Sequence, residues 1–290
     1  MTVDGWDGRG LPPVARARVD RAAADGVRTS LLSAGGAAGL EVAGFEVVGE
    51  VLGTTVMQIG WSGYGGCGWQ TGLGAFAPAV SGRSPWSGYA PYVKAVRQGR
   101  DTALSRLLQE AAALGADGVV GVRFTDERMD ATKREFMALG TAVRSRGRQR
   151  PAAPFTTELG GQDVAKLLAA GWVPVGMAYG IAVAVRHDDW RTQRQNSVWA
   201  GNNEVTGYTE LLNHTRADAR RDFTARAGRL GADAALLSAL WSRMWPVEIG
   251  ENHTDHVAEC VLTGTAIASF RPGRPAATSS LTILPLRGMR

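Results

Sequence analysis

Two histidines and a cysteine near the C-terminal end of the chain have the side chains and spacing of a transition-metal site. His253 and His256 are three positions apart, and Cys260 follows four positions later. Imidazole nitrogens and thiolates are ligands for zinc, copper or nickel, and Glu251 or Asp255 would add oxygen ligands. If a strand begins at His256, Cys260 shares its face, and His253 must fold back from the loop. The hypothesis is a divalent transition metal on His253, His256 and Cys260; the alternative for Cys260 is an ordinary buried thiol.

Two other segments carry residues with catalytic chemistry. His187 is followed by Asp188 and Asp189, and a histidine beside carboxylates can bind a metal or transfer protons. Aspartates also favour the turn at the end of a strand. Cys67 lies between glycines, where an exposed thiol would be reactive, but no histidine neighbours it in the sequence. An enzyme that uses His187, Asp188 or Cys67 is therefore one alternative function.

The segment 60–91 is predicted to be a long loop rich in glycine and aromatic residues. Such side chains can stack on bases or on a flat ligand. They can also cover the open side of a sheet or seal a subunit interface, which is the role we favour. The aromatic residues in question are Trp61, Tyr64, Trp69, Phe76, Trp86 and Tyr89.

The elements that must position these residues recur along the chain. The two Gly-Ala-Asp sequences lie 231 − 115 = 116 positions apart, and the two Gly-Thr-Ala sequences lie 264 − 140 = 124 positions apart. Three anchors recur in the same order with spacers of different length, which indicates duplication with loop insertions and not a solenoid of fixed period. The anchors are Ala43–Gly49 with Ala170–Gly176, Gly115–Asp117 with Gly231–Asp233, and Gly140–Ala142 with Gly264–Ala266.

The residue pattern predicts the α+β class, with two tandem β-α-β-β repeats. A short helix is expected over 14–24, and Gly35, Gly36 and Gly39 are expected to break any helix between that segment and the first repeat. The first repeat has strands at 45–55 (extended over 56–61), 119–125 and 135–144, and a helix at 92–114. The second has a short helix at 162–170, strands at 172–186, 234–240 and 257–270, and a helix at 209–230.

Apolar spacing predicts which face of each long helix contacts its sheet. Arg106, Gln109 and Glu110 are expected on the opposite, solvent face of the first helix. The residues expected to face the sheets are Leu104, Leu107, Leu108, Ala111 and Leu114 in the first helix, and Leu212, Ala219, Phe223, Ala227 and Leu230 in the second.

The predicted organisation has five parts. Residues 1–40 are an N-terminal extension, 41–145 the first repeat, 146–160 a linker, 161–270 the second repeat, and 271–290 a tail. The linker is rich in Arg, Pro and Gly, which is typical of a boundary. Residues 281–286 could add an edge strand.

Composition indicates a globular protein with two small cores. The chain has 290 residues, of which 44% are apolar and 20% charged. It has no apolar run long enough for a membrane span and no visible signal peptide. Its two cysteines are expected to be thiols. We therefore expect a cytoplasmic protein without membrane contact. The net charge is +5, with basic residues concentrated at Arg144, Arg146, Arg148 and Arg150. A basic nucleic-acid-binding protein is an alternative that we do not favour.

Three motifs carry a resemblance to a known family. The first strand contains Val48–Gly53, the helix ends in the motif Glu110–Val122, and the last strand contains Gly140–Val143. These sequences resemble the YbjQ-like "putative heavy-metal-binding" family over residues 44–144, apart from the long loop. The second repeat matches less closely, because Gly121 has no clear counterpart there. The tandem arrangement is similar to the two-repeat form seen in high-GC actinobacteria.

The resemblance implies a fold and an assembly. It implies β-α-β-β units like dodecin subunits, each an antiparallel sheet against a helix. It also implies a ring, for which we expect five chains. It transfers no metal ligand, because the family's metal description carries no agreed ligand set. A three-stranded sheet with one helix has open edges, which pairing with further copies would cover. The expected function is therefore a non-enzymatic, ring-forming homo-oligomer that could bind a metal or small ligand.

Overall fold

The computed structural model describes residues 6, 10–24, 28–59, 80–81, 89–130, 132–148, 150–151, 153–248 and 254–270. Every structural statement below concerns this part of the chain. In order, the elements are α1 (Pro13–Ala24), α2 (Ala34–Val42), β1 (Phe45–Gln58), β2 (Val80–Ser81), α3 (Ala90–Ala113), β3 (Gly118–Arg128), β4 (Lys133–Ser145), β5 (Phe155–Thr156), α4 (Gly161–Ala169), β6 (Trp172–His187), α5 (Trp190–Gln195), the 3-10 helix η2 (Val198–Ala200), α6 (Thr206–Arg229), β7 (Ala234–Glu248) and β8 (Thr254–Ser269).

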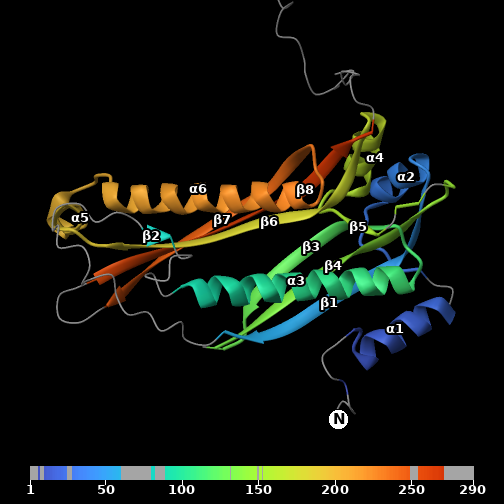
Figure 1. Cartoon of the computed structure of the whole chain (residues 1–290), viewed down its shortest axis with the longest axis horizontal. Coiled ribbons are helices and arrows are strands. Elements are labelled where there is room, and N and C mark those ends of the chain that lie inside the picture. The colour runs from blue at the N-terminus through green and yellow to red at the C-terminus, as the bar shows by residue number, and fades with distance from the viewer. Residues whose placement is uncertain are drawn as a thin grey trace, which may run out of the picture.

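The strands form two sheets, and the long strands of each sheet come from one half of the chain (Figure 1). The short strand β2, from the first half, pairs with β6 of the second sheet. The first sheet is mixed, with the order β1-β4-β3-β5, because β5 runs parallel to β3. The second has the order β2-β6-β8-β7, and all its strand pairs are antiparallel. In each half the long helix follows the first long strand, and the last strand lies between the other two. This α+β arrangement is consistent with the two repeats expected from the sequence.

Glycines in the strands allow each long helix to lie directly on its sheet. A Cβ on Gly53 in β1 would lie 2.0 Å from the carbonyl oxygen of Ala103 in α3. A Cβ on Gly180 in β6 would likewise lie 2.0 Å from the carbonyl oxygen of Ala219 in α6. Strand glycines commonly mark such close approaches of backbone. The two halves therefore use the same device at matching crossings.

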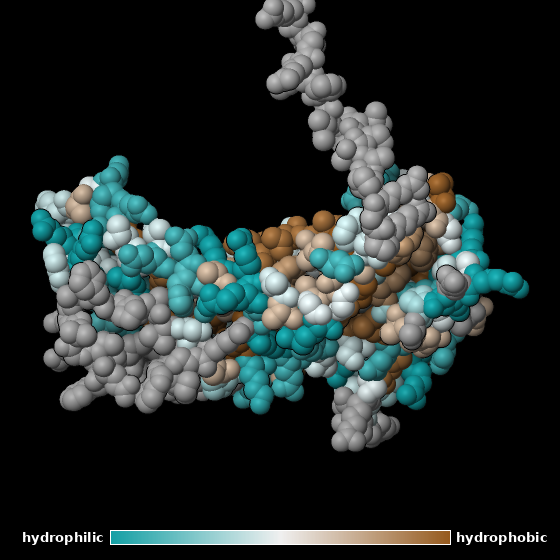
Figure 2. Space-filling model, turned by 45° about the horizontal axis from the view of Figure 1, so that its top comes forward, coloured by the Kyte–Doolittle hydropathy of each residue, from teal (hydrophilic) through white to brown (hydrophobic). Residues whose placement is uncertain are grey.

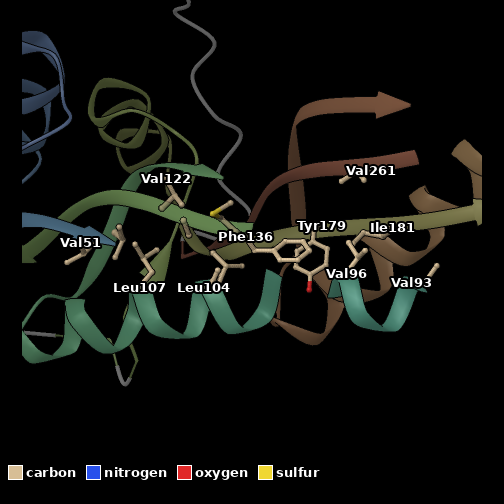
Figure 3. Packing of buried hydrophobic residues seen from close by; sticks show 14 of the residues in the cluster. Val51, Val93, Val96, Leu104, Leu107, Val122, Phe136, Tyr179, Ile181 and Val261 are labelled. Carbon is tan, nitrogen blue, oxygen red and sulfur yellow. The ribbon is translucent and has the colours of Figure 1, made fainter. Parts of the chain in front are cut away.

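The main apolar core joins both halves of the molecule. It contains Val93 and Val96 of α3 together with residues of both sheets. In Figure 3, Phe136 of β4 lies beside Tyr179 of β6, above α3. Helix α3 therefore packs against its own sheet and also against the sheet of the second half.

The predicted helix faces are largely confirmed. Leu104, Leu107 and Ala111 are buried in α3, and Ala219, Phe223 and Ala227 are buried in α6. Leu108, Leu114 and Leu212 are half-buried, and Leu230 is exposed.

Glu110 contradicts the prediction of a solvent-facing side chain, because it is buried. Its carboxylate accepts a hydrogen bond from the N–H of Leu52 at 2.8 Å and pairs with Arg18. The N-terminal helix α1 supplies that arginine. Coverage of α3 by α1 as well as by the sheet is the reason that apolar spacing alone misplaced this face.

Helix α2 contradicts the prediction that Gly35, Gly36 and Gly39 break any helix directly before the first repeat. Ser33 caps it by accepting the N–H of Gly36 at 3.1 Å. A Cβ on Gly161 of α4 would lie 2.1 Å from the carbonyl oxygen of Gly36, so the two helices meet where neither has a side chain. The cap and this close packing outweigh the low helix propensity of glycine.

The predicted linker contains a strand that the sequence did not indicate. In β5, Phe155 and Thr156 pair in parallel with Gly118 and Val119 of β3. Hydrogen bonds between segment 155–159 and β3 cover the outer edge of that strand. The boundary between the halves is therefore a structural joint.

Three other predicted boundaries differ from the structure. Strand β7 continues past the predicted end at 240 to Glu248, through Pro246. Proline has no N–H to donate, and sheets accommodate it mainly in edge strands such as this one. The predicted loop 187–207 contains α5, capped by Asp189, and η2. The predicted loop 60–91 contains β2.

Several predicted features lie outside the described residues. They include Cys67, His253, and the tail with its possible edge strand at 281–286. Of the loop aromatics, Tyr89 is described and is buried. No helix in the described ranges is long and apolar enough to cross a bilayer.

Candidate functional site

The outer strand of the second sheet combines an open backbone edge with exposed apolar side chains. Strand β7 has 15 residues and, within the described chain, pairs only with β8. Leu236, Leu237, Leu240 and Trp241 on this strand are 40–55% exposed. Figure 2 shows apolar surface gathered in the middle and right of the molecule, whereas the described left end is largely hydrophilic. An open, apolar edge strand is a surface suited to pairing with another chain.

The two predicted histidine motifs meet at one end of the β6–β8 ladder. His187 opposes Asp255, and the preceding Arg186 opposes His256. Nδ1 of His187 lies 2.7 Å from Oδ1 of Asp255, and Nδ1 of His256 lies 2.9 Å from Oδ1 of Asp188. Both aspartates are buried. Each histidine is therefore held by a carboxylate from the opposite motif.

Further polar contacts hold this end of the sheet. The hydroxyl of Tyr208 donates to Asp188 at 3.1 Å, and its ring lies 4.3 Å from the ring of His256, centroid to centroid. Burial, followed by the nearby negative charge of Asp188, raises the pKa of Tyr208 above its ordinary value. Arg186 pairs with Asp189 at 3.0 Å. Burial opposes ionisation of Asp189, but hydrogen bonds from Thr192 and the charge of Arg186 lower its pKa overall.

Each histidine–aspartate pair contains the side chains needed for acid–base chemistry, but the two pairs do not form one site. A carboxylate that orients an imidazole is the usual support for a general base. Successive residues of a strand point to opposite faces, so His187 and His256 lie on opposite faces of the sheet. They do not converge on one substrate position, and the pairs tie the end of β6 to the start of β8.

The residues proposed for a metal site are separated among the described part of the chain. Cys260 is fully buried with Ala182 and Ala219, and burial raises the pKa of its thiol. Four residues of strand place it about 13 Å along β8 from His256. His256 is bonded to Asp188, and His253 lies outside the described residues. No group of three His, Cys, Asp or Glu side chains in the described ranges could hold a metal ion.

A buried polar network between the two halves was not predicted. The hydroxyl of Tyr92 in α3 donates to Glu259 of β8 at 3.0 Å, and it accepts from Arg134 of β4 at 2.7 Å. Arg243 of β7 donates to the same carboxylate at 2.8 Å. Burial, with the charge of Glu259, raises the pKa of Tyr92 to about 12. Charged residues inside otherwise apolar strands were the only sequence signal for this network.

A cavity of about 290 Å³ lies beside this network. Arg100, Asp126, Arg134 and Glu158 contribute its charged lining. Arg100 and Arg134 both pair with Asp126, so the charges largely compensate one another. Burial lowers the pKa of Arg100 and raises that of Asp126.

Comparisons with known proteins place these observations in a family. A family profile described as "Putative heavy-metal-binding" matches residues 73–146, which include α3, β3 and β4. A UPF0145 protein of Sulfurisphaera tokodaii is 34% identical over 98 residues, which cover 34% of this chain and 75% of that protein. The chain belongs to the YbjQ/UPF0145 family. The resemblance stated from the sequence motifs is confirmed.

Two further relatives match smaller shares of their own length. A UPF0145 protein of Halorubrum lacusprofundi is 47% identical over 55 residues, covering 19% of this chain and 53% of that protein. A protein named encapsulin nanocompartment protein, from Mycobacterium tuberculosis, is 35% identical over 180 residues. That alignment covers 60% of this chain and 62% of the mycobacterial protein. The chain thus spans between half and two thirds of these two relatives.

The metal description of the YbjQ/UPF0145 family does not fit the described donor set. Of the predicted ligands, the thiol of Cys260 lies in an apolar cluster, and the imidazole of His256 is paired with Asp188. No third donor accompanies either of them among the described residues. The open β7 edge is therefore the feature of this family member that has a clear functional interpretation.

Proposed function

We propose that this chain is a non-enzymatic assembly protein that associates with copies of itself into a closed ring or cage-like particle. The proposal treats each half as a dodecin-like subunit. It also places the protein in the cytoplasm, with its own chain as its main partner. The observation that carries it is the long edge strand β7, which pairs only with β8 among the described strands and whose large apolar side chains are exposed.

Physical chemistry supports association through this strand. The outer edge of this 15-residue strand, which no described segment pairs with, offers a row of backbone donors and acceptors. Four large apolar side chains beside it gain from leaving water. Two different surfaces that meet head to tail produce a ring when the rotation closes. Five chains is the number that the family resemblance implies.

The name of the mycobacterial relative supports the same class of function. It is described as an encapsulin nanocompartment protein, and 60% of the present chain aligns with it. We therefore extend the proposal to a role in, or together with, a protein compartment. Binding of a metal or small ligand would be a second property of the particle.

The basic residues at the end of the first repeat and in the predicted linker give little support to nucleic-acid binding. Arg144, Arg146 and Arg150 each lie within 3.5 Å of a carboxylate, so their charges are partly neutralised. A phosphate backbone would have to compete with these pairs.

The native mass in solution tests the proposal. Light scattering at micromolar concentration should give a mass of several chains, and Leu237→Lys should lower it by placing a charge on the β7 edge. Val198→Lys is the matched control, because Val198 is 90% exposed in η2, away from this strand. A wild-type protein that remains monomeric would contradict the proposal.

A further inference from the structure

Segment 155–159 forms a complete joint between the first half of the chain and the second. Its backbone hydrogen bonds run in both directions. The N–H of Phe155 donates to the carbonyl of Asp117, just before β3, at 3.1 Å, and the N–H of Thr157 donates to Val119 at 3.0 Å. In return, the N–H of Gly121 donates to Leu159 and that of Val122 donates to Thr157, each at 2.9 Å. The same segment leads directly into α4 and β6 of the second half. The joint therefore attaches the leading segment of one half to the edge of the other.

Segment 28–32 occupies the matching position at the start of the first half. Phe155 precedes Trp172 of β6 by 172 − 155 = 17 positions, and Arg28 precedes Phe45 of β1 by 45 − 28 = 17 positions. In both cases a helix begins six positions after the segment starts, since 161 − 155 and 34 − 28 both equal 6. The two leading segments are thus equivalent in their spacing.

Matching hydroxyl contacts support this equivalence. The side chain of Thr157 accepts the N–H of Leu159 at 3.0 Å, and that of Ser30 accepts the N–H of Leu32 at 3.1 Å. The Thr157 hydroxyl also lies 2.9 Å from that of Thr265 in β8. The Ser30 hydroxyl lies 3.5 Å from that of Thr141 in β4. Each segment is therefore held against its own half in the same way.

The strand edges correspond as well. Gly118 and Val119 of β3 oppose Val143 and Ala142 of β4, and Ala234 and Ala235 of β7 oppose Ile267 and Ala266 of β8. Both ladders contain a register shift shortly afterwards. Strand β3 has segment 155–159 on its outer side, whereas no described segment pairs with the outer side of β7.

We propose that residues 28–32 of a second copy add to the outer edge of β7 as a short parallel strand. This inference deepens the proposed self-association and rests on it. The N–H groups of Arg28 and Ser30, which match the donors Phe155 and Thr157, donate to no backbone carbonyl among the described residues. Their acceptors across the joint would be the carbonyl groups of Asp233 and Ala235.

This joint uses different surfaces on its two sides and therefore propagates. Each chain offers its leading segment to one neighbour and its β7 edge to the other, which is a head-to-tail contact. Every repeat in a closed ring would then be attached to the next by the same strand addition, within the chain or between chains. A ring built this way holds an even number of repeats.

Two positions distinguish the proposed joint from the one inside the chain. In the sequence repeat, Leu237 occupies the position of Gly121, which has a positive φ of 61°. Ala34 occupies the position of Gly161, which touches α2. We expect pairing at Asp233 and Ala235 to be kept, and the two short helices to lie further apart than α2 and α4 do. Paired strand residues have Cα separations within the range of a disulfide, which makes the joint testable.

The test is a disulfide between the two sides of the joint. Arg28→Cys and Ala234→Cys, which match the pair Phe155 and Gly118, are introduced together in a Cys67→Ser background. After mild oxidation, a non-reducing gel should show a ladder of covalent multimers. A mixture of the two single-cysteine chains should show one disulfide-linked heterodimer. Arg28→Cys with Trp199→Cys is the matched control, because Trp199 is exposed in η2.

Native mass measured on the same samples separates the two proposals. A ladder from the Arg28–Ala234 pair, absent from the control, supports the joint. An assembly of several chains that gives no ladder overturns the joint and leaves the proposed self-association in place. A monomer that gives no ladder overturns both.

Discussion

Replacing Gly180 by alanine should strongly destabilise the protein, because β6 and α6 touch at this residue. The new Cβ would lie 2.0 Å from the carbonyl oxygen of Ala219 and 2.6 Å from the amide nitrogen of Phe223. Ordinary contact begins at about 3.4 Å, so a gap of at least 3.4 − 2.0 = 1.4 Å must open. Ala219 packs with fully buried Cys260 in this layer, which leaves no space for a local adjustment. We expect a loss near the upper end of the usual overpacking cost, about 3 kcal/mol.

Gly228→Ala is the matched control for this experiment. It adds the same methyl group to α6, where no atom lies within 4 Å of the new Cβ. Alanine is favoured over glycine in a helix by about 0.5–1 kcal/mol, so this variant should be slightly more stable than the wild type. The two substitutions are chemically identical and should have opposite signs.

Thermal unfolding followed by circular dichroism, at one protein concentration, measures both effects. A domain of this size shifts its midpoint by about 2–4 °C per kcal/mol, so Gly180→Ala should lower it by about 6–12 °C. Gly228→Ala should raise it by about 1–4 °C. A Gly180→Ala midpoint within about 2 °C of the wild type would refute the claim that the helix and strand are in direct backbone contact.

Three other outcomes are expected. Leu107→Ala in α3 should cost about 2–5 kcal/mol because Leu107 is fully buried. Leu230→Ala at the end of α6 should cost far less because Leu230 is 40% exposed. Equal losses of stability in thermal unfolding would show that the faces assigned to these helices are wrong. The pKa of Tyr92 is raised from 10.0 to about 12, so the stability that this hydroxyl contributes is complete below pH 10 and is lost as the pH rises towards 12. Urea unfolding at pH 9 and pH 11 should therefore show a smaller alkaline loss of stability in Tyr92→Phe than in the wild type. An equal loss in the two proteins would contradict the burial of this hydroxyl. A strong chelator should leave the thermal midpoint unchanged, and a large fall reproduced by His256→Ala would establish a structural metal.

The sequence pattern was sufficient for the long elements and for the short helices α1 and α4, and insufficient for α2, α5 and β5. The helices α3 and α6 have apolar residues at helical spacing, which is a local property that the chain records directly. Helix α2 and strand β5 depend on contacts across the molecule, with Gly161 of α4 and Gly118 of β3 respectively. Local composition at α2 favours a turn, so only its tertiary partner makes it helical.

The candidate site illustrates the same limit. His187 and His256 were each recognisable as chemical residues, but their exchange of aspartate partners follows from β6 lying beside β8. The periodicity of the sequence indicates where strands occur, but it does not indicate which strands lie next to each other in the sheet. The contact of Tyr92 with Glu259 joins residues 167 positions apart, and no local pattern could have indicated it.

The position of α3 between the two sheets has a consequence for how the molecule opens. Val93 and Val96 belong to the first half, and they share one core with Ile181 and Val261 of the second. Separation of the halves would expose that core on both sides, so we expect that neither half unfolds independently of the other. Amide hydrogens in α3 and in the centre of β6 should therefore exchange with solvent at the same slow rate, through one concerted opening of the whole molecule. Sequence duplication has here produced a single cooperative unit.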